Sequence, residues 1–393
     1  MRKKKIIKKR HTAYFKLAKP IGKYFSIKHN FKYERFKLKK GEGYLIMANH
    51  QTMLDPLLMA MSFNRPIYIV ASDHIFNKSI PSRAMQHCFS PIKKKKATTD
   101  ISFIVDCVSV AKAGGNVLIY PEGNRAWADF QFYIDRSVVK LVRMLKLPLM
   151  LYNLEGGYGV NPRWGNGLRK GEFNGRIKKI LTVSEIQALS DDELYNVISE
   201  GLRVIDSESG KTYKSKVRAE FLERELFVCP KCKTESNLYS HGEFVTCNHC
   251  GLTVEYTEDL KLKSNDKDFT FSRLVEWYKF QLEYIKNKEL KGDEDIIFTD
   301  SPVELVDKTT SNNKVVAKGV LTLTRTEVAI GDLKIPVGEI QSLTVIGGTK
   351  LTINTQDKSM MIKGHDRFNP LKYILTFNVL RPDLREKYYA LDI

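Results

Sequence analysis

Four short apolar runs that alternate with helical segments constrain the first half of this chain more than any other feature. Each run has the length of a buried strand, and the strands are predicted at GYLIMA (43–48), RPIYIVA (65–71), NVLIY (116–120) and LPLMLYNL (147–154). The intervening segments have apolar residues at helical spacing, which predicts helices at 55–62, 101–113 and about 133–146. Strands that alternate with helices predict an α/β fold with a mostly parallel sheet.

The ends of these helices have recognisable signals. Asp55 is able to cap the first helix, and Pro56 suits its first turn. Ser190 and Glu193 have the spacing of a capping box and precede a further helical pattern. Gly114 and Gly115 end the helix that begins near residue 101.

The pattern changes after about residue 210. A charged helix is expected over 213–227 and an aromatic-rich helix over 270–290, whereas residues beyond 292 alternate as short strands before a last helix at 369–380. We therefore divide the chain into five parts: a basic arm (1–40), an α/β domain (41–212), a linker helix with a cysteine region (213–262), a helical connector (263–292) and a small β-rich domain (293–393).

Four of the six cysteines form two close pairs. Cys229 and Cys232 are separated from Cys247 and Cys250 by fourteen residues. Two CxxC pairs at this spacing predict a zinc ribbon, in which four thiolates close a tetrahedral and therefore structural site. His241 and His249 are less favoured ligands. Residues 225–260 hold two lysines against six acids, a net charge of −4 that argues against binding of nucleic acid by the ribbon.

The positive charge of the chain is concentrated at its beginning. Residues 1–40 hold sixteen Lys or Arg residues and one acid, Glu34, so they contribute +15 of the net +19. Such an arm suits nucleic acid, an anionic membrane surface or plain solvation. Interleaved apolar residues such as Leu17, Ile21 and Ile27 favour the membrane surface, and Pro20 is expected to kink or split a helix there.

Hydrophobic length argues against integral insertion. No run approaches the roughly 18 apolar residues of a membrane span, and lysines interrupt every apolar run near the N-terminus. These patterns predict an intracellular protein that is peripheral on the inner, cytoplasmic face of a membrane.

Two polar clusters follow predicted strands in the α/β domain. His50 and Asp55 come after the first strand, while Glu122, Gly123, Asn124 and Arg125 come after the third. A single histidine after a strand is usually structural, but ligand sites gather at the carboxyl ends of parallel strands. The two clusters therefore predict one crevice that holds a base, a carboxylate and a guanidinium, and the guanidinium suits a phosphate.

These clusters resemble the motifs of a known family. Asn49-His50-(four residues)-Asp55 and Pro121-Glu122-Gly123-Asn124-Arg125 are similar to the NHxxxxD and PEGTR boxes of the 1-acylglycerol-3-phosphate O-acyltransferases, over roughly residues 15–210. The resemblance implies that His50 is a general base, that Asp55 orients it, and that residues 122–125 bind the acceptor with Arg125 on its phosphate. The acyl donor would be acyl-CoA or acyl carrier protein. Asn124 replaces the usual threonine or serine.

The resemblance implies transfer of a fatty acyl group to a lysophospholipid, with 1-acylglycerol-3-phosphate as the expected acceptor and phosphatidic acid as the product. Glycerol-3-phosphate or another lysolipid is the alternative acceptor, and a non-catalytic lipid-binding scaffold is the alternative class. Lys93 to Lys96 fill the place of an intermediate arginine-bearing box, where they would attract donor phosphates or simply form a solvated loop. The β-rich domain resembles a PH-like domain that docks to lipid or protein, or only packs.

Overall fold

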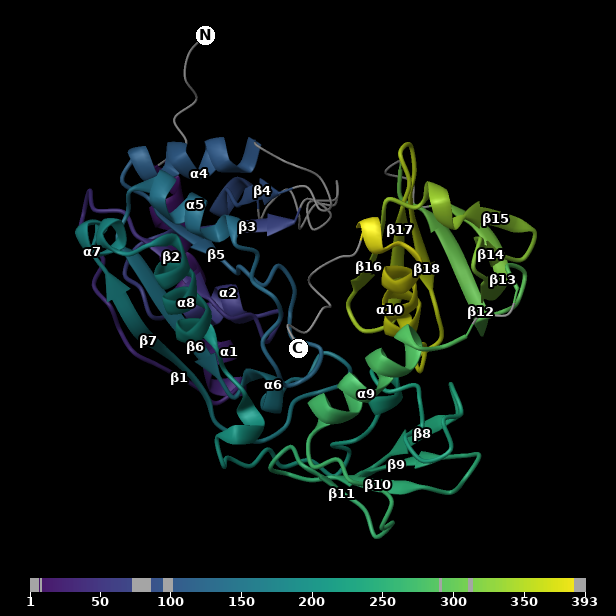
Figure 1. Ribbon diagram of the computed structural model, residues 1–393. Helices are drawn as coiled ribbons and strands as arrows, with labels where there is room; N and C mark the ends of the chain where they lie inside the picture. The colour runs from purple at the N-terminus through teal and green to yellow at the C-terminus, as the bar shows by residue number, and fades with distance from the viewer. Residues whose placement is uncertain are drawn as a thin grey trace.

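The computed structural model describes residues 7, 9–72, 86–94, 102–289, 292–309 and 314–384. Figure 1 shows three parts: an α/β domain, a small sheet that follows it, and a C-terminal β-rich domain, with helix α9 (Leu274–Lys286) between the last two. The α/β fold with a mostly parallel sheet, followed by further β-rich parts, is confirmed.

The sheet of the α/β domain has seven strands in the order β1-β7-β6-β2-β5-β3-β4. Every neighbouring pair is parallel except β6 and β7. The strands are β1 (Phe31–Tyr33), β2 (Leu45–Ala48), β3 (Ile67–Ser72), β4 (Ile92–Lys94), β5 (Asn116–Ile119), β6 (Leu149–Glu155) and β7 (Phe173–Leu181). The four predicted strands correspond to β2, β3, β5 and β6.

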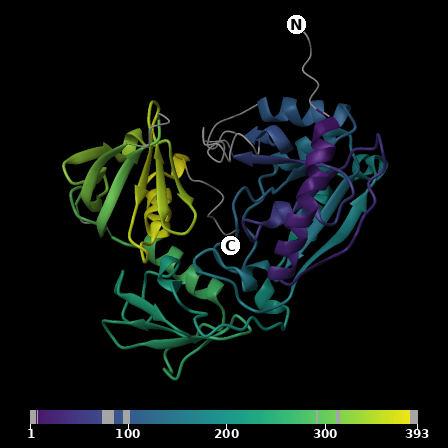
Figure 2. The same cartoon turned by 180° about the vertical axis from the view of Figure 1, so that it is seen from behind.

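Helices cover both faces of this sheet, which explains why its central strands are apolar on both sides. Leu45 and Met47 of β2 point into one core, whereas Ile46 and Ala48 point into the other. The first face is covered by α4 (Ser102–Lys112), α5 (Ser137–Leu145) and α8 (Asp191–Leu202). The second is covered by α1 (Lys9–Lys28) and α2 (Asp55–Ala60), and α1 runs along the outside of the domain in Figure 2.

Helix ends follow the sequence signals, with two exceptions. Asp55 does not cap α2: it is the first residue of the helix, Leu54 is at the N-cap position without a side-chain bond, and the Asp55 carboxylate instead accepts from the preceding Gln51 and Thr52 N–H groups. Ser190 and Glu193 form the expected capping box, since the Ser190 Oγ accepts from the Glu193 N–H and the Glu193 carboxylate accepts from the Ser190 N–H. The second exception is helix α1, which continues across Pro20 without a split. Pro20 lies on the exposed side of α1, where water can bond the carbonyl that loses its N–H partner.

The expected helix over 213–227 is wrong. The segment consists of turns and one 3₁₀ turn at Leu222–Arg224, and Phe221 has a φ of 72°. Some of its N–H groups bond to a neighbouring hairpin, since Ala219 donates to the Gly242 carbonyl and Leu222 to the Ser240 hydroxyl, while others make short-range turn bonds such as Glu220 to Val217. Turn bonds and these contacts with the hairpin therefore take the place of a regular helix.

The hairpin belongs to a four-stranded antiparallel sheet in the order β11-β10-β9-β8. Its strands are β8 (Leu238–His241), β9 (Phe244–Cys247), β10 (Thr253–Tyr256) and β11 (Leu262–Lys263). Helix α9 packs on this part through Trp277, whose indole N–H donates to the Val228 carbonyl at 2.8 Å.

The C-terminal domain is a seven-stranded antiparallel sheet followed by α10 (Pro370–Leu380). The strands are β12 (Phe298–Asp307), β13 (Val315–Leu323), β14 (Glu327–Ile330), β15 (Leu333–Pro336), β16 (Ser342–Ile346), β17 (Lys350–Asn354) and β18 (Ser359–Lys363). Their order is β15-β14-β13-β12-β18-β17-β16. The likeness to a PH-like domain stays a prediction.

Candidate active site and metal centre

The two polar clusters meet at one edge of the parallel sheet. Strands β2 and β5 are direct neighbours with Met47 opposite Ile119, so the residues after each strand leave the sheet side by side. The Ala126 N–H donates to the His50 carbonyl at 2.9 Å, which joins the two segments beyond the strands. The structure therefore brings His50 and Asp55 together with residues 122–125, as the strand pattern predicts.

His50 and Asp55 form a directed pair. The His50 Nδ1 lies 2.8 Å from the Asp55 Oδ2, and the imidazole is partly exposed whereas the carboxylate is fully buried. A carboxylate only accepts hydrogen bonds, so Nδ1 carries the proton and Nε2 keeps its lone pair. Nε2 has no hydrogen-bond partner in the described part of the chain. The arrangement presents a base whose tautomer is set by its carboxylate neighbour.

The Asp55 carboxylate is held by the loop that it closes. Its oxygens accept from the Gln51 N–H at 2.7 Å, the Thr52 N–H at 2.9 Å and the Thr52 hydroxyl at 2.6 Å. These bonds tie residues 50–55 into a compact turn before α2. Thr52 is a site residue that sequence reasoning missed, because it occupies a variable position of the motif and carries no signal of its own.

Side chains next to His50 anchor the loop to β6. The Asn49 amide donates to the Leu154 carbonyl and accepts from the Leu154 N–H, both at 2.8 Å. The Gln51 side-chain Oε1 accepts from the Gly157 N–H at 2.7 Å. Two bonds in opposite directions to one residue leave the loop little freedom at the start of the motif.

Tyr120, the last residue of the third predicted strand, covers one face of the His50 imidazole. The Tyr120 ring is stacked on His50, with the ring centroids 4.2 Å apart and the planes at 18°. After Tyr120 the chain turns, since the Gly123 N–H donates to the Tyr120 carbonyl at 3.0 Å. Gly123 has a φ of 69°, a left-handed conformation that favours glycine, which explains this residue within the second motif.

Glu122 lies beneath the site rather than in it. The side chain is only 2% exposed, and its carboxyl oxygens accept from the His50 N–H at 3.4 Å and the Phe132 N–H at 3.2 Å. Burial raises the pKa of Glu122 to about 8, against the opposing effect of the two N–H donors, and the Asp55 charge adds to the rise. Its contacts support an orienting role toward the backbone of His50 in the first motif and of Phe132 beyond the second.

Arg125 is the cationic member of the site. Burial lowers the pKa of its guanidinium, and the nearby Asp55 carboxylate acts in the opposite direction. Its guanidinium has no hydrogen-bond or ion-pair partner among the residues that the structure describes. The adjacent Asn124 side chain is buried. A half-buried guanidinium without a protein partner is suited to an anionic ligand.

A pair of buried acids supports the floor of the site from further away. Asp129 accepts from the Asp206 and Ser207 N–H groups, while Asp206 accepts from the Gly156 and Gly159 N–H groups. Burial and the neighbouring Asp129 raise the pKa of Asp206 to about 7. Sequence reasoning missed this pair because 77 residues separate its members.

The lysine segment is described only in part. Lys93 and Lys94 belong to β4 at an edge of the sheet, where the Lys94 ammonium lies 5.1 Å from the centre of the Phe103 ring. Lys95 and Lys96 lie outside the described residues.

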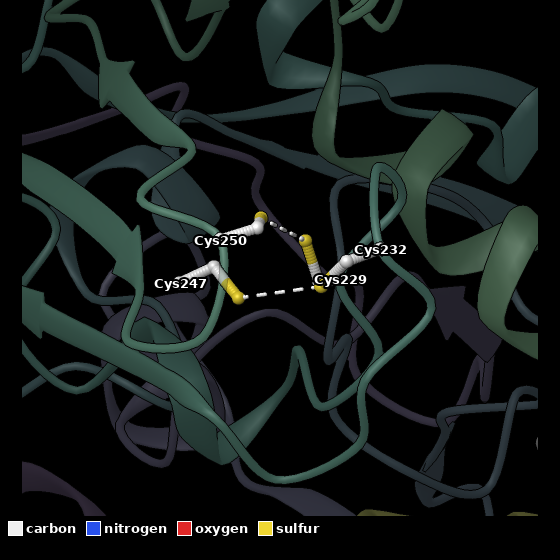
Figure 3. Close-up of side chains that lie close together, drawn as sticks. All are labelled: Cys229, Cys232, Cys247 and Cys250. Carbon is white, nitrogen blue, oxygen red and sulfur yellow. Dashed lines mark hydrogen bonds between the residues drawn. The ribbon is translucent and has the colours of Figure 1, made fainter.

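The four paired cysteines converge in the second part of the chain (Figure 3). All four Sγ atoms lie within 4.8 Å of one another, with Cys229 and Cys250 3.6 Å apart and Cys232 and Cys247 3.7 Å apart. Four sulfurs at about 2.3 Å from a tetrahedral zinc ion would be about 3.8 Å apart. The cluster is therefore able to bind a metal ion. His241 is not a member: its ring is exposed and faces Glu220.

Comparison with known proteins found one matching family model and a similar solved structure. Residues 30–150 match the family model "Acyltransferase", which confirms the resemblance drawn from the two motifs. The crystal structure of the 1-acyl-sn-glycerophosphate (LPA) acyltransferase PlsC from Thermotoga maritima is similar at 15% identity and a TM-score of 0.42, covering 50% of this chain and 80% of that one. No curated protein matches the chain.

The raised pKa of Glu122 predicts an effect of pH on the stability of the folded protein. Its pKa is about 8 in the folded protein and 4.5 in an ordinary environment, so between these values the folded protein holds a proton that the unfolded chain has lost. The stability that this group contributes is therefore complete at low pH and falls as the pH rises through that window. We expect the unfolding midpoint of the wild type to fall more steeply from about pH 5 to about pH 8 than that of Glu122→Gln.

The exposed Glu339→Gln serves as the control, because its side chain lies in solvent in both states. A Glu122→Gln slope identical to that of the wild type would contradict a protonated Glu122 in the folded protein.

Proposed function

We propose that this protein, whose residues 30–150 match the acyltransferase family model, transfers a fatty acyl group from acyl-CoA or acyl carrier protein to 1-acylglycerol-3-phosphate, forming phosphatidic acid. One observation carries the proposal: the His50 Nδ1 is bonded to Asp55 at 2.8 Å while Nε2 is left without a protein partner, in a site that also holds Arg125. The arrangement unites a base for an alcohol with a cation for a phosphate.

The reaction follows from this geometry. Nε2 of His50 removes the proton of the acceptor hydroxyl as the oxygen attacks the thioester carbonyl. Asp55 stabilises the imidazolium that forms. The tetrahedral intermediate collapses with loss of the thiolate, which takes the proton from His50, and an ester replaces the thioester. The substrate alcohol thus stands where a serine stands in a hydrolase triad.

Arg125 supplies recognition of the acceptor phosphate. A guanidinium binds phosphate oxygens bidentately and keeps its charge when partly buried. Glu122, itself in the second motif, accepts from the His50 N–H of the first, and this bond would help His50 and Arg125 to keep their spacing. Because this cation is part of the same loop as Ala126, which bonds to His50, phosphate binding would position the acceptor hydroxyl near Nε2.

Two other functions would use the same fold. Glycerol-3-phosphate or another lysolipid as acceptor requires the same base and the same cation, and separation of labelled products distinguishes these acceptors. A non-catalytic lipid-binding scaffold has no need of a His–Asp pair with an open Nε2, so the intact pair favours the enzyme.

Replacement of His50 tests catalysis. We expect His50→Ala to lower kcat for acyl transfer to lysophosphatidic acid by about 10²- to 10⁴-fold, because the hydroxyl loses its base. The control is His241→Ala, which removes an exposed imidazole in the ribbon. Equal turnover by the wild type and His50→Ala, in purified protein with acyl donor and vesicles, would refute catalysis at this site.

The outer side of α1 supports a peripheral membrane location. Its buried side contacts the α/β domain through His11, Phe15, Gly22 and Ser26. Its outer side exposes Leu17 (70%), Ile21 (56%), Tyr24 (60%) and Ile27 (72%), among exposed lysines. An apolar stripe flanked by lysines suits an anionic bilayer surface, with the inner face of the membrane as the proposed location. No helix in the described ranges has the length and hydropathy needed to cross a bilayer.

Ile21→Asp tests the membrane surface. On the membrane, the Ile21 side chain would be buried in the bilayer surface, which is worth about 1.5–3 kcal/mol of binding free energy. Loss of this side chain and addition of a negative charge should lower binding to phosphatidylglycerol vesicles by at least about tenfold in a sedimentation assay. Ile296→Asp is the matched control, since Ile296 is similarly exposed (62%) on a different part of the chain. Equal loss of binding in both variants would show that the outer side of α1 is not the specific membrane-binding surface.

We further propose that the cysteine cluster binds one structural zinc ion. Four sulfur ligands fill a tetrahedral site and leave no position for a substrate. The ion would join the Cys229 loop to the Cys247 loop and so fix the small sheet against the rest of the chain.

Metal analysis tests this proposal. We expect about one zinc per purified chain, and loss of most of it in the double variant Cys229→Ser/Cys247→Ser, because thiolates are the ligands. Cys107→Ser is the control, since Cys107 is buried in α4 among apolar residues. Full zinc content in the double variant would show that the metal lies elsewhere.

A further inference from the structure

A polar cavity of about 340 Å³ lies where the α/β domain, the linker and the C-terminal domain meet. Its lining includes Met53 and Arg125 from the two motifs, Arg163 and Arg224 from the segments that follow, and Thr349 and Asp366 from the C-terminal domain. A cavity of this size accommodates a small headgroup. Because Met53 and Arg125 come from the two motifs, the cavity adjoins the proposed active site.

The lining is strongly cationic. Arg125, Arg163 and Arg224 stand against one carboxylate in the wall, that of Asp366. Arg163 donates to the Gly347 and Val345 carbonyls at 3.0 Å, and its guanidinium lies 4.4 Å from the centre of the Trp127 ring. Arg163 also donates to the Arg125 carbonyl at 3.3 Å, so these bonds fix its guanidinium beside the second motif and against the β16–β17 turn.

Arg224 is held in the same manner. It donates to the Asp366 and Trp164 carbonyls at 2.7 and 2.8 Å and to the Asn166 side chain at 2.9 Å. These bonds connect the linker to the α/β domain on one side and to the C-terminal domain on the other. Burial lowers the pKa of Arg224 to about 10, which leaves it charged at neutral pH.

The turn between β16 and β17 closes the cavity. Gly348 lies so near the Arg163 backbone that a Cβ atom there would come within 3.2 Å of the Arg163 carbonyl. The next residue, Thr349, lines the cavity, and its hydroxyl has no hydrogen-bond partner in the described part of the chain. The turn is thus anchored close to the site and presents an unused donor.

We propose that the C-terminal domain completes the binding site for the acceptor headgroup, with Thr349 and Arg224 facing the phosphate that Arg125 binds. The inference rests on the proposed function for the identity of the ligand, a glycerophosphate headgroup, but its new content is the contribution of residues outside the acyltransferase domain. The β-rich domain then acts as a specificity element, because the β16–β17 turn limits the size and charge of the headgroup.

Kinetics of Thr349→Asp test this inference. A carboxylate in the cavity repels the headgroup phosphate, so the KM for lysophosphatidic acid should rise about tenfold or more, while kcat and the KM for the acyl donor stay close to wild type. Gln356→Asp adds the same charge in the exposed turn at the other end of β17 and should leave all three values unchanged. Thr349→Val, which only removes the hydroxyl, should raise the acceptor KM about two- to fivefold and guards against misfolding of the aspartate variant.

Direct binding separates this inference from the proposed function. Isothermal titration of the full chain with sn-glycerol 3-phosphate should give weaker binding for Thr349→Asp and for Arg125→Ala than for Gln356→Asp. If no lysolipid is acylated but this binding pattern holds, the proposed function fails and the composite site stands. If transfer occurs and both Thr349 variants match wild type in acceptor KM and in binding, the composite site is overturned while the proposed function stands.

Discussion

The pairing of β2 with β5 on one side and β6 on the other is the constraint on which the site depends. Parallel neighbours end at the same edge of a sheet, so residues 49–55, 120–126 and 154–157 leave the sheet together. The bonds between Asn49 and Leu154 and between Ala126 and His50 then connect these three segments. The base and the cation keep their spacing because rigid strands support them, rather than because either loop is rigid by itself.

Within that frame, a single carboxylate organises the chemistry. The four donors around Asp55 come from a stretch of three residues, Gln51, Thr52 and His50, which makes the motif a self-contained unit. A carboxylate bound in this way cannot rotate without loss of several hydrogen bonds, so the imidazole bonded to it has one orientation. Tyr120 completes the support from the next strand by covering one face of the ring. The result is a fixed base with one open nitrogen.

Arginines join the later parts of the chain to one another and to this domain. Arg218 pairs with Glu243 and Glu255 in the small sheet, and Arg367 of the C-terminal domain pairs with Glu220 and Glu223 of the linker. Arg163 and Arg224 extend the same pattern to the edge of the candidate active site. Since Arg224 precedes Cys229 by only five residues, a metal ion in the cysteine cluster would also stabilise the position of this cationic wall.

The sequence alone determined the local features of this protein. Apolar runs of strand length, the Ser190 capping box and the spacing of the cysteine pairs each depend on neighbouring residues, and the structure has the corresponding strands, cap and cluster. Tertiary structure decided the rest. Residues 213–227 bond to a hairpin instead of forming a helix, and Arg163, Arg224 and Thr349 join Arg125 around one cavity. No periodicity in the sequence reports a contact between residues more than a hundred positions apart, because such a contact is formed by packing of whole domains.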